Sequence, residues 1–234
     1  MRKLFISDIH GCFNEMNMLL KQSDFDPAVD QLIVGGDLID RGPDSAKVLA
    51  YMKGLQENNP DKVIVLLGNH EDMLNMYIKG INTMWLGHGK EAIRSFKEYF
   101  TDEMLQEHIE WLFRQSVIYG DDEFVYVHAG IIPSYALNDQ PREEVLWMPY
   151  SRSGVRFSAY GVEEILRVTH QRKVVHGHTP TASIKDDGAR ICCDLGAGVY
   201  KDRAKLALAD LSGGFYYYYD FSEKKIKTAK ILSI

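Results

Sequence analysis

Residues 36–42, Gly-Asp-Leu-Ile-Asp-Arg-Gly, place two carboxylates and one guanidinium, which can bind metal or phosphate, within seven residues. They follow the apolar run 31–34, which predicts a buried strand that ends at two glycines. Asp37 can offer carboxylate oxygens to a metal ion, Asp40 can orient a histidine, and Arg41 can bind two oxygens of a phosphate. Such a strand end packs poorly, but it suits a site at the carboxyl edge of a sheet.

Other predicted strands stop in a similar way, at Asp, Asn or His beside a glycine. The residues at these ends are Asp8 and His10, Asn69 and His70, His128, and His176 and His178. One such turn is usually a solvated helix cap, but five strand ends with nitrogen and oxygen ligands favour a metal site, with two ions rather than one. The set contains no Cys, which disfavours a structural zinc cluster.

The order of these motifs resembles that of the calcineurin-like metallophosphoesterases. The motifs are Asp-x-His, Gly-Asp-x-x-Asp-Arg-Gly, Gly-Asn-His-Glu, His-Ala-Gly and Gly-His-Thr, and they run from Asp8 to His178. Five motifs in order make the resemblance specific, although each alone would be weak. Within the superfamily, the chain looks like the phosphoprotein phosphatase branch in its short bacterial and phage form.

The resemblance implies an α/β fold with four layers, αββα, in which two mixed sheets lie face to face and a dinuclear metal site lies at the strand ends. The implied ligands are Asp8 and His10 for one ion, Asn69, His128 and His178 for the other, and Asp37 as the bridge between them. We expect Mn, with Fe or Zn as alternatives. A hydroxide between ions about 3.5–4 Å apart would attack phosphorus in line.

The resemblance also implies which residues act on the phosphoryl group. His70 would protonate the leaving oxygen, because an alkoxide leaves poorly without a proton. Asp40 would hold His70 in the required tautomer, as carboxylates do in catalytic triads. Arg41 would clamp phosphoryl oxygens and stabilise the charge of the transition state.

The resemblance implies a second phosphate-binding arginine in the loop-rich stretch 132–161, which contains Arg142, Arg152 and Arg156. We choose Arg152, because it follows Leu-Trp at 146–147 after a short interval. Arg156 is the alternative, since the spacing is ambiguous. Solvated loop arginines are the competing interpretation.

Residues 72 to about 116 predict a helical insertion over one edge of the site. Its two apolar stripes fit a substrate-selecting cap or structural cover, and ordinary amphipathic faces favour cover. We expect His88 and His108, which belong to no motif, to be surface or packing residues. Glu71 is expected to complement the helix dipole rather than to bind metal.

The bulk properties predict one compact domain over residues 1–234, with 45% hydrophobic and 26% charged residues. No apolar run approaches the roughly 18 residues of a membrane helix. The start of the chain lacks a signal-peptide pattern, and three cysteines do not make a disulfide framework, so a cytoplasmic location is expected. A net charge of −6 disfavours an extended nucleic-acid surface.

Four functions remain open. We expect a serine/threonine protein phosphatase. Its substrate would be a phosphorylated protein or a small phosphoester. The alternative is a dinucleoside polyphosphate hydrolase, for example of diadenosine tetraphosphate. By family resemblance alone, the intact pair Asp40-Arg41 favours the phosphatase, since symmetrically cleaving bacterial tetraphosphatases usually carry another residue before that arginine. A metal-bound scaffold or sensor and, more weakly, a nuclease complete the set.

Overall fold

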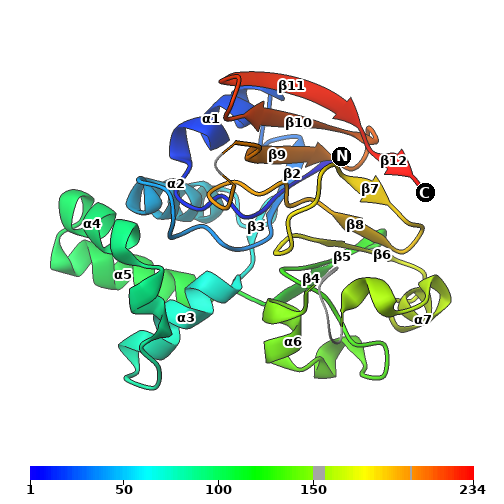
Figure 1. Ribbon diagram of the computed structural model, residues 1–234, viewed down its shortest axis with the longest axis horizontal. Coiled ribbons are helices and arrows are strands. Elements are labelled where there is room, and N and C mark those ends of the chain that lie inside the picture. The colour runs from blue at the N-terminus through cyan, green and yellow to red at the C-terminus, as the bar shows by residue number, and fades with distance from the viewer. Residues whose placement is uncertain (150–155, 201) are drawn as a thin grey trace.

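The computed structural model describes residues 1–149, 156–200 and 202–234. Two six-stranded mixed sheets form its centre, with strand orders β11-β10-β9-β1-β2-β3 and β12-β7-β8-β6-β5-β4 (Figure 1). The first contains β1 (Arg2–Ile6), β2 (Asp30–Val34), β3 (Val63–Val65), β9 (Lys205–Asp210), β10 (Phe215–Asp220) and β11 (Lys225–Lys230). The second contains β4 (Ile118–Gly120), β5 (Phe124–Val127), β6 (Lys173–His176), β7 (Lys185–Asp186), β8 (Arg190–Cys192) and β12 (Leu232–Ser233).

Helices cover the outer face of each sheet (Figure 1). The α-helices are α1 (Phe13–Gln22), α2 (Ser45–Asn58), α3 (Asn69–Ile78), α4 (Lys90–Tyr99), α5 (Asp102–Phe113), α6 (Arg142–Trp147) and α7 (Val162–Val168). The short 3₁₀ helices are η1 (Met84–Gly87), η2 (Leu137–Asp139) and η3 (Phe157–Ala159). This arrangement confirms the predicted four-layer α/β fold.

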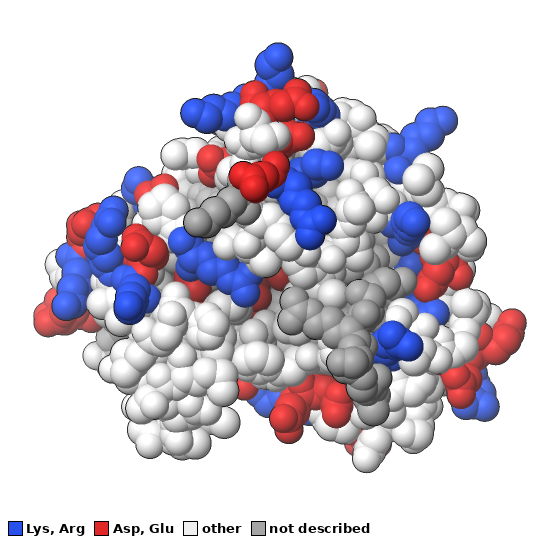
Figure 2. All heavy atoms as spheres, in the orientation of Figure 1, with Lys and Arg blue, Asp and Glu red and all other residues white. Residues whose placement is uncertain are grey.

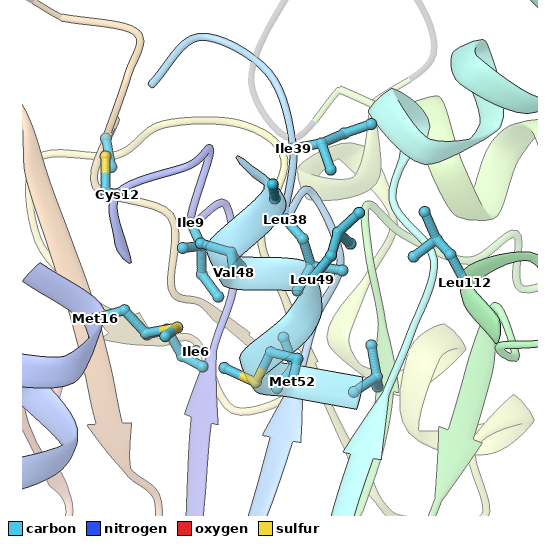
Figure 3. Packing of buried hydrophobic residues seen from close by; sticks show 14 of the residues in the cluster. Ile6, Ile9, Cys12, Met16, Leu38, Ile39, Val48, Leu49, Met52 and Leu112 are labelled. Carbon is cyan, nitrogen blue, oxygen red and sulfur yellow. The ribbon is translucent and has the colours of Figure 1, made fainter. Parts of the chain in front are cut away.

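Both faces of the central strands are buried, so their side chains alternate between two cores. Leu4 and Ile6 join the core under α1 and α2, whereas Phe5 faces the space between the sheets. Figure 3 shows α2 lying along β1, β2 and β3, with Met16 and Met52 against Ile6. A third core lies between the second sheet and helices α6 and α7.

The closing strands pack as their alternation predicts. Tyr216 and Tyr218 face the inter-sheet core, whereas Tyr217 and Tyr219 face the core under the helices. The tyrosine run therefore serves packing on both faces of β10.

The predicted insertion, residues 72 to about 116, begins within α3 and continues through η1, α4 and α5. Its helices α4 and α5 pack against α2. The Ser95 hydroxyl on α4 accepts the N–H of Ala46 at 3.0 Å, and Leu112 on α5 joins the core beside Leu49 (Figure 3). His108 is buried, and its ring centroid lies 4.4 Å from that of Phe100. These contacts are those of structural cover, and His108 is a packing residue as expected.

In its described part, the stretch expected to be loop-rich contains an α-helix, α6, which the sequence analysis missed. The helix is only six residues long, and prolines flank it at positions 141 and 149. A segment this short between prolines carries no helical repeat, so its pattern resembles that of a loop. No helix in the described ranges has both the length and the apolar character needed to cross a bilayer.

The packing of α1 generates a stability prediction with a matched control on the same helix. Met16 is fully buried, whereas Met18 is 42% exposed. We expect Met16→Ala to lower the free energy of unfolding by about 2–4 kcal/mol, because the lost contacts leave a cavity. Met18→Ala should change it by less than about 0.5 kcal/mol. Urea denaturation measures both, and equal effects would contradict the assigned packing of α1.

Candidate metal and phosphate site

The predicted ligands converge at one edge of the two sheets. Asp8 and His10 follow β1, Asp37 follows β2, Asn69 begins α3 after β3, His128 follows β5, and His178 follows β6. Within each sheet the strands concerned, β1–β3 and β5–β6, are parallel neighbours, so their carboxyl ends meet at the same edge. His178 is half-buried and the other five are buried.

Asp37 lies at the centre of this cluster. Its Oδ2 atom is 3.5 Å from Nε2 of His10, and its Oδ1 atom is 3.5 Å from Nε2 of His128. Asp8, Asp37 and His128 bring one ligand atom each within 4.8 Å of one another, and so do His10, Asp37 and His70. Each carboxylate oxygen of Asp37 therefore faces a different half of the site, as the predicted bridging role requires.

Asn69 joins the histidines of the second half. Its side-chain oxygen lies 2.9 Å from Nε2 of His128 and 3.0 Å from Nδ1 of His178. The three residues predicted to share one ion thus meet at their ligand atoms, although two of them come from the second sheet and one from the first.

Backbone carbonyls orient two of the histidines. Nδ1 of His10 lies 2.9 Å from the carbonyl oxygen of Ile39, and Nδ1 of His128 lies 2.8 Å from that of Gly35. Because a carbonyl only accepts, Nδ1 carries the hydrogen and donates it, which leaves the Nε2 lone pair facing Asp37. Metal-binding histidines are commonly held in this way.

The electrostatics of the cluster fit bound cations. Burial lowers the pKa of His10 well below its ordinary value and that of His178 to about 2, so both are in the neutral form that binds metal. Burial raises the pKa of Asp37 to about 6, and burial and the neighbouring Asp8 carboxylate raise the pKa of Asp194 well above its ordinary value. Divalent cations would offset this crowding of buried carboxylates, so the donor set fits two of them.

Backbone strain is concentrated at the predicted site. Ten non-glycine residues in the described ranges have a positive φ, and six of them are predicted site residues: Asp8, His10, Asp37, Asp40, Arg41 and His178. Such conformations persist only where the surroundings enforce them, and they cluster at functional sites. Glycines make room for the strained loops, since a Cβ at Gly68 would lie 2.2 Å from Oδ1 of Asp37.

Glu71 has a larger role than the expected dipole complement. Its fully buried carboxylate accepts the backbone N–H groups of Asp37, Leu38 and Gly68 at 2.8 Å and that of Ile39 at 3.2 Å. The Gly68 contact is local, because Gly68 is the N-cap residue of α3 and Glu71 lies in its first turn. The contacts with the loop after β2 are long-range, so the expectation of a simple first-turn charge was incomplete.

His70 and Asp40 form the predicted pair. Nδ1 of His70 lies 2.6 Å from Oδ2 of Asp40, and its Nε2 lies 3.1 Å from Nη2 of Arg41. Burial lowers the pKa of His70 to about 4 and raises that of Asp40 to about 7. Since Arg41 can only donate, Nε2 accepts and Nδ1 donates to Asp40.

Trp85 is a site neighbour that the sequence analysis missed. Its buried indole Nε1–H donates to both carboxylate oxygens of Asp40, at 3.1 and 3.0 Å. His88 is exposed as expected, yet its ring centroid lies 5.7 Å from that of His70. Both belong to the segment expected to be cover, which therefore also reaches the site. Neither lies in a motif, so no local signal marks them.

The choice between Arg152 and Arg156 stays a prediction. Arg152, our choice for the second phosphate-binding residue, lies outside the described residues. Arg156 is exposed just before η3. Arg142 on α6 forms an ion pair with Asp72 on α3, with 2.9 Å between Nη2 and Oδ1.

His176 was expected to be a hydrogen-bonded strand histidine. It is buried, and its Nδ1 atom lies 3.2 Å from the carbonyl oxygen of Gly177.

Comparisons with known proteins agree on the family. The model of the calcineurin-like phosphoesterase family matches residues 1–210. A protein of Buchnera aphidicola subsp. Schizaphis graminum, named symmetrical bis(5'-nucleosyl)-tetraphosphatase, is 34% identical over 163 residues, covering 67% of this chain and 54% of its own. A protein of the same name from Nitrosospira multiformis is 27% identical over 228 residues, covering 97% and 79%. The chain spans about half the length of most of the curated relatives it matches.

Solved structures share the fold. A putative diadenosine tetraphosphatase superposes with a TM-score of 0.63 at 19% identity, covering 98% of this chain and 93% of that one. A serine/threonine phosphatase from Saccharomyces cerevisiae superposes with a TM-score of 0.68 at 17% identity, covering 100% and 80%. At these identities the likeness concerns the fold alone.

The hydrogen bonds of Trp85 predict a positioning role for this residue. Trp85→Phe removes the N–H that orients Asp40, so we expect kcat to fall roughly 10-fold with little change in KM. The acid limb of the pH profile should move to higher pH, because a lost donor raises the pKa of a carboxylate.

Trp111→Phe is the matched control for Trp85→Phe. Trp111 is also buried, and its Nε1–H donates to Gln56 at 2.8 Å. This variant should lower stability but leave kcat and the pH profile unchanged. Equal kinetic effects of the two variants would show that Trp85 acts through stability alone.

The pairing of His70 with Asp40, rather than a predicted metal-binding role, generates a second kinetic prediction. His70→Asn should lower kcat about 10²–10⁴-fold, because it removes the proton donor. The bound metal, measured by elemental mass spectrometry, should stay unchanged. His170→Asn, a change in the exposed turn that follows α7, is the control that should affect neither quantity. Loss of metal in His70→Asn would instead make His70 a ligand.

Proposed function

Because the chain belongs to the calcineurin-like phosphoesterase family, we propose that it hydrolyses a bis(5'-nucleosyl) tetraphosphate with the help of two divalent cations. The observation that carries the reaction type is the convergence of nitrogen and oxygen ligands on Asp37, beside the His70–Asp40 pair and Arg41. The names of the curated relatives support the substrate class.

The comparisons favour the tetraphosphatase over the serine/threonine protein phosphatase that the sequence analysis preferred. That preference depended on the pair Asp40-Arg41. Curated relatives that are 34% identical over 163 residues and 39% identical over 144 residues carry the tetraphosphatase name. The yeast phosphatase is a structural neighbour at only 17% identity, so it gives no support for substrate. The protein phosphatase remains the second candidate because of the intact pair.

The roles proposed for the residues follow from their positions. Asp8, His10, Asp37, Asn69, His128 and His178 would hold the cations, for which Mn is our choice. Bound cations would supply a deprotonated water and neutralise charge on the phosphoryl oxygens. Arg41 would bind a phosphoryl oxygen in front of His70, since its guanidinium already faces Nε2 of that ring.

His70 would donate a proton from Nε2 to the leaving phosphate oxygen. This requires the protonated ring, which the polyphosphate charge and the carboxylate of Asp40 on Nδ1 both favour. Trp85 would hold Asp40 in place through its bond to both carboxylate oxygens. The buried network around His70 thus comes from the loop after β2, from α3 and from η1.

Turnover of two substrates, compared side by side, tests the proposal. Chelator-stripped protein with Mn added back should cleave diadenosine tetraphosphate into two molecules of ADP, and faster than it cleaves a phosphothreonine peptide. The stripped protein and His70→Asn serve as controls and should show little activity. Faster cleavage of the peptide would establish the protein phosphatase, and products of ATP and AMP would contradict symmetrical cleavage.

A further inference from the structure

A cavity of about 680 Å³ lies between α3, the start of η1 and α6. Figure 1 shows α3 and α6 next to each other at the lower edge of the molecule. The uncharged side chains that line it are Met73, Asn75, Met76, Asn82, Met84 and Trp147. Its volume falls within the range of about 300–1,000 Å³ that is usual for small-molecule sites.

The cavity adjoins the candidate active site on several sides. Met73 lies on α3 three residues after His70. Met84 directly precedes Trp85, whose indole N–H binds Asp40. The ring centroid of Trp147 lies 6.3 Å from that of His178. Trp147 therefore places one wall of the cavity beside the predicted metal ligand His178.

The charge of the cavity wall disfavours a phosphate as its occupant. Two acidic side chains, Asp72 and Glu143, and two basic side chains, Lys79 and Arg142, line it, so their charges balance. Arg142 is already paired with Asp72 at 2.9 Å. In Figure 2, charged side chains gather over α4, whereas the lobe formed by α3 and η1 is mostly uncharged. The wall therefore suits an uncharged group.

The chemistry of the uncharged lining suits a flat heteroaromatic ring. Methionine thioethers make favourable contacts with aromatic rings, and the half-buried indole of Trp147 offers a surface for stacking. Asn75 and Asn82 supply amides that match the donors and acceptors of a base edge. The Asn82 oxygen accepts the Met84 N–H at 2.6 Å, so the NH₂ group of Asn82 is the part that can donate to a ligand.

We propose that this cavity binds the purine base at one end of the substrate while the phosphate chain extends to the metal ligands. The inference rests on the proposed function, because only a nucleotide substrate carries such a base. An apolar side chain of a phosphopeptide is the competing occupant.

Tryptophan fluorescence tests the inference without turnover. Trp147 is half-buried at the cavity, whereas Trp85 and Trp111 are buried elsewhere, so stacking of a base should quench the signal of Trp147. We expect saturable quenching of the Mn-loaded protein by adenosine 5'-monophosphate. Ribose 5-phosphate, which has the sugar and the phosphate but no base, should cause little quenching. Equal effects of the two ligands would overturn the inference.

Variants of the cavity wall make the test specific. Met76→Glu places a charge in the cavity, and Met84→Ala removes one thioether at a half-exposed position where folding is not at risk. We expect Met84→Ala to weaken binding of adenosine 5'-monophosphate roughly 2- to 10-fold, and Met76→Glu to weaken it more. Ile78→Glu is the matched control, because Ile78 is on the same helix, is 54% exposed and is not among the lining residues. Turnover of p-nitrophenyl phosphate, which has no base, should be the same in all three variants as in the wild-type protein.

The outcomes separate this inference from the proposed function. If diadenosine tetraphosphate yields ADP but the wall variants bind adenosine 5'-monophosphate like wild type, the base binds elsewhere and the inference fails alone. If base-dependent quenching depends on the wall but no tetraphosphate is cleaved, the proposed function fails while the base site is supported. If the phosphothreonine peptide, rather than the nucleotide, quenches Trp147, the competing occupant is correct.

Discussion

The buried carboxylate of Glu71 connects the two loops on which the candidate site depends. It accepts three N–H groups from the loop after β2 and one from the turn before α3. A buried backbone N–H without a partner costs about 1–3 kcal/mol, so this carboxylate stabilises a loop conformation that would otherwise be unfavourable. Asp37, with its positive φ, can then point one oxygen to His10 and the other to His128.

The site also requires that the two sheets keep a fixed relation to each other. Asp8, Asp37 and Asn69 come from the first sheet, while His128 and His178 come from the second. The inter-sheet core, with Phe5 stacked near Tyr126 at 6.0 Å between ring centroids, holds the sheets together. Because protein interiors are close-packed, this core limits sliding of the sheets, which would separate the ligands.

The segment 72–116 combines packing with a contribution to the site. Its helices α4 and α5 cover α2. Its short helix η1 contains Trp85, whose indole N–H donates to Asp40. The same segment, with α6 from the opposite side, forms the wall of the cavity. Cover and substrate selection, which the sequence left as alternatives, are therefore compatible: one part of the segment packs, and another faces the candidate site.

The sequence by itself determined the ligand types, the strand ends that carry them and the amphipathic helices between them. These are local properties, since a strand end at Asp37 or a stripe through Met16 can be recognised within a few residues. The resemblance of the motif order added the pairing of His70 with Asp40, which the structure shows at 2.6 Å.

Only the tertiary structure decided the partners of Glu71, the approach of Trp85 and the cavity beside α6. Trp85 and Asp40 are 45 residues apart, and Glu71 and Asp37 are 34 apart. No local pattern encodes such contacts, because they arise when separate elements pack together. A buried acceptor such as Glu71 looks like an ordinary first-turn glutamate until the loop that donates to it has been placed.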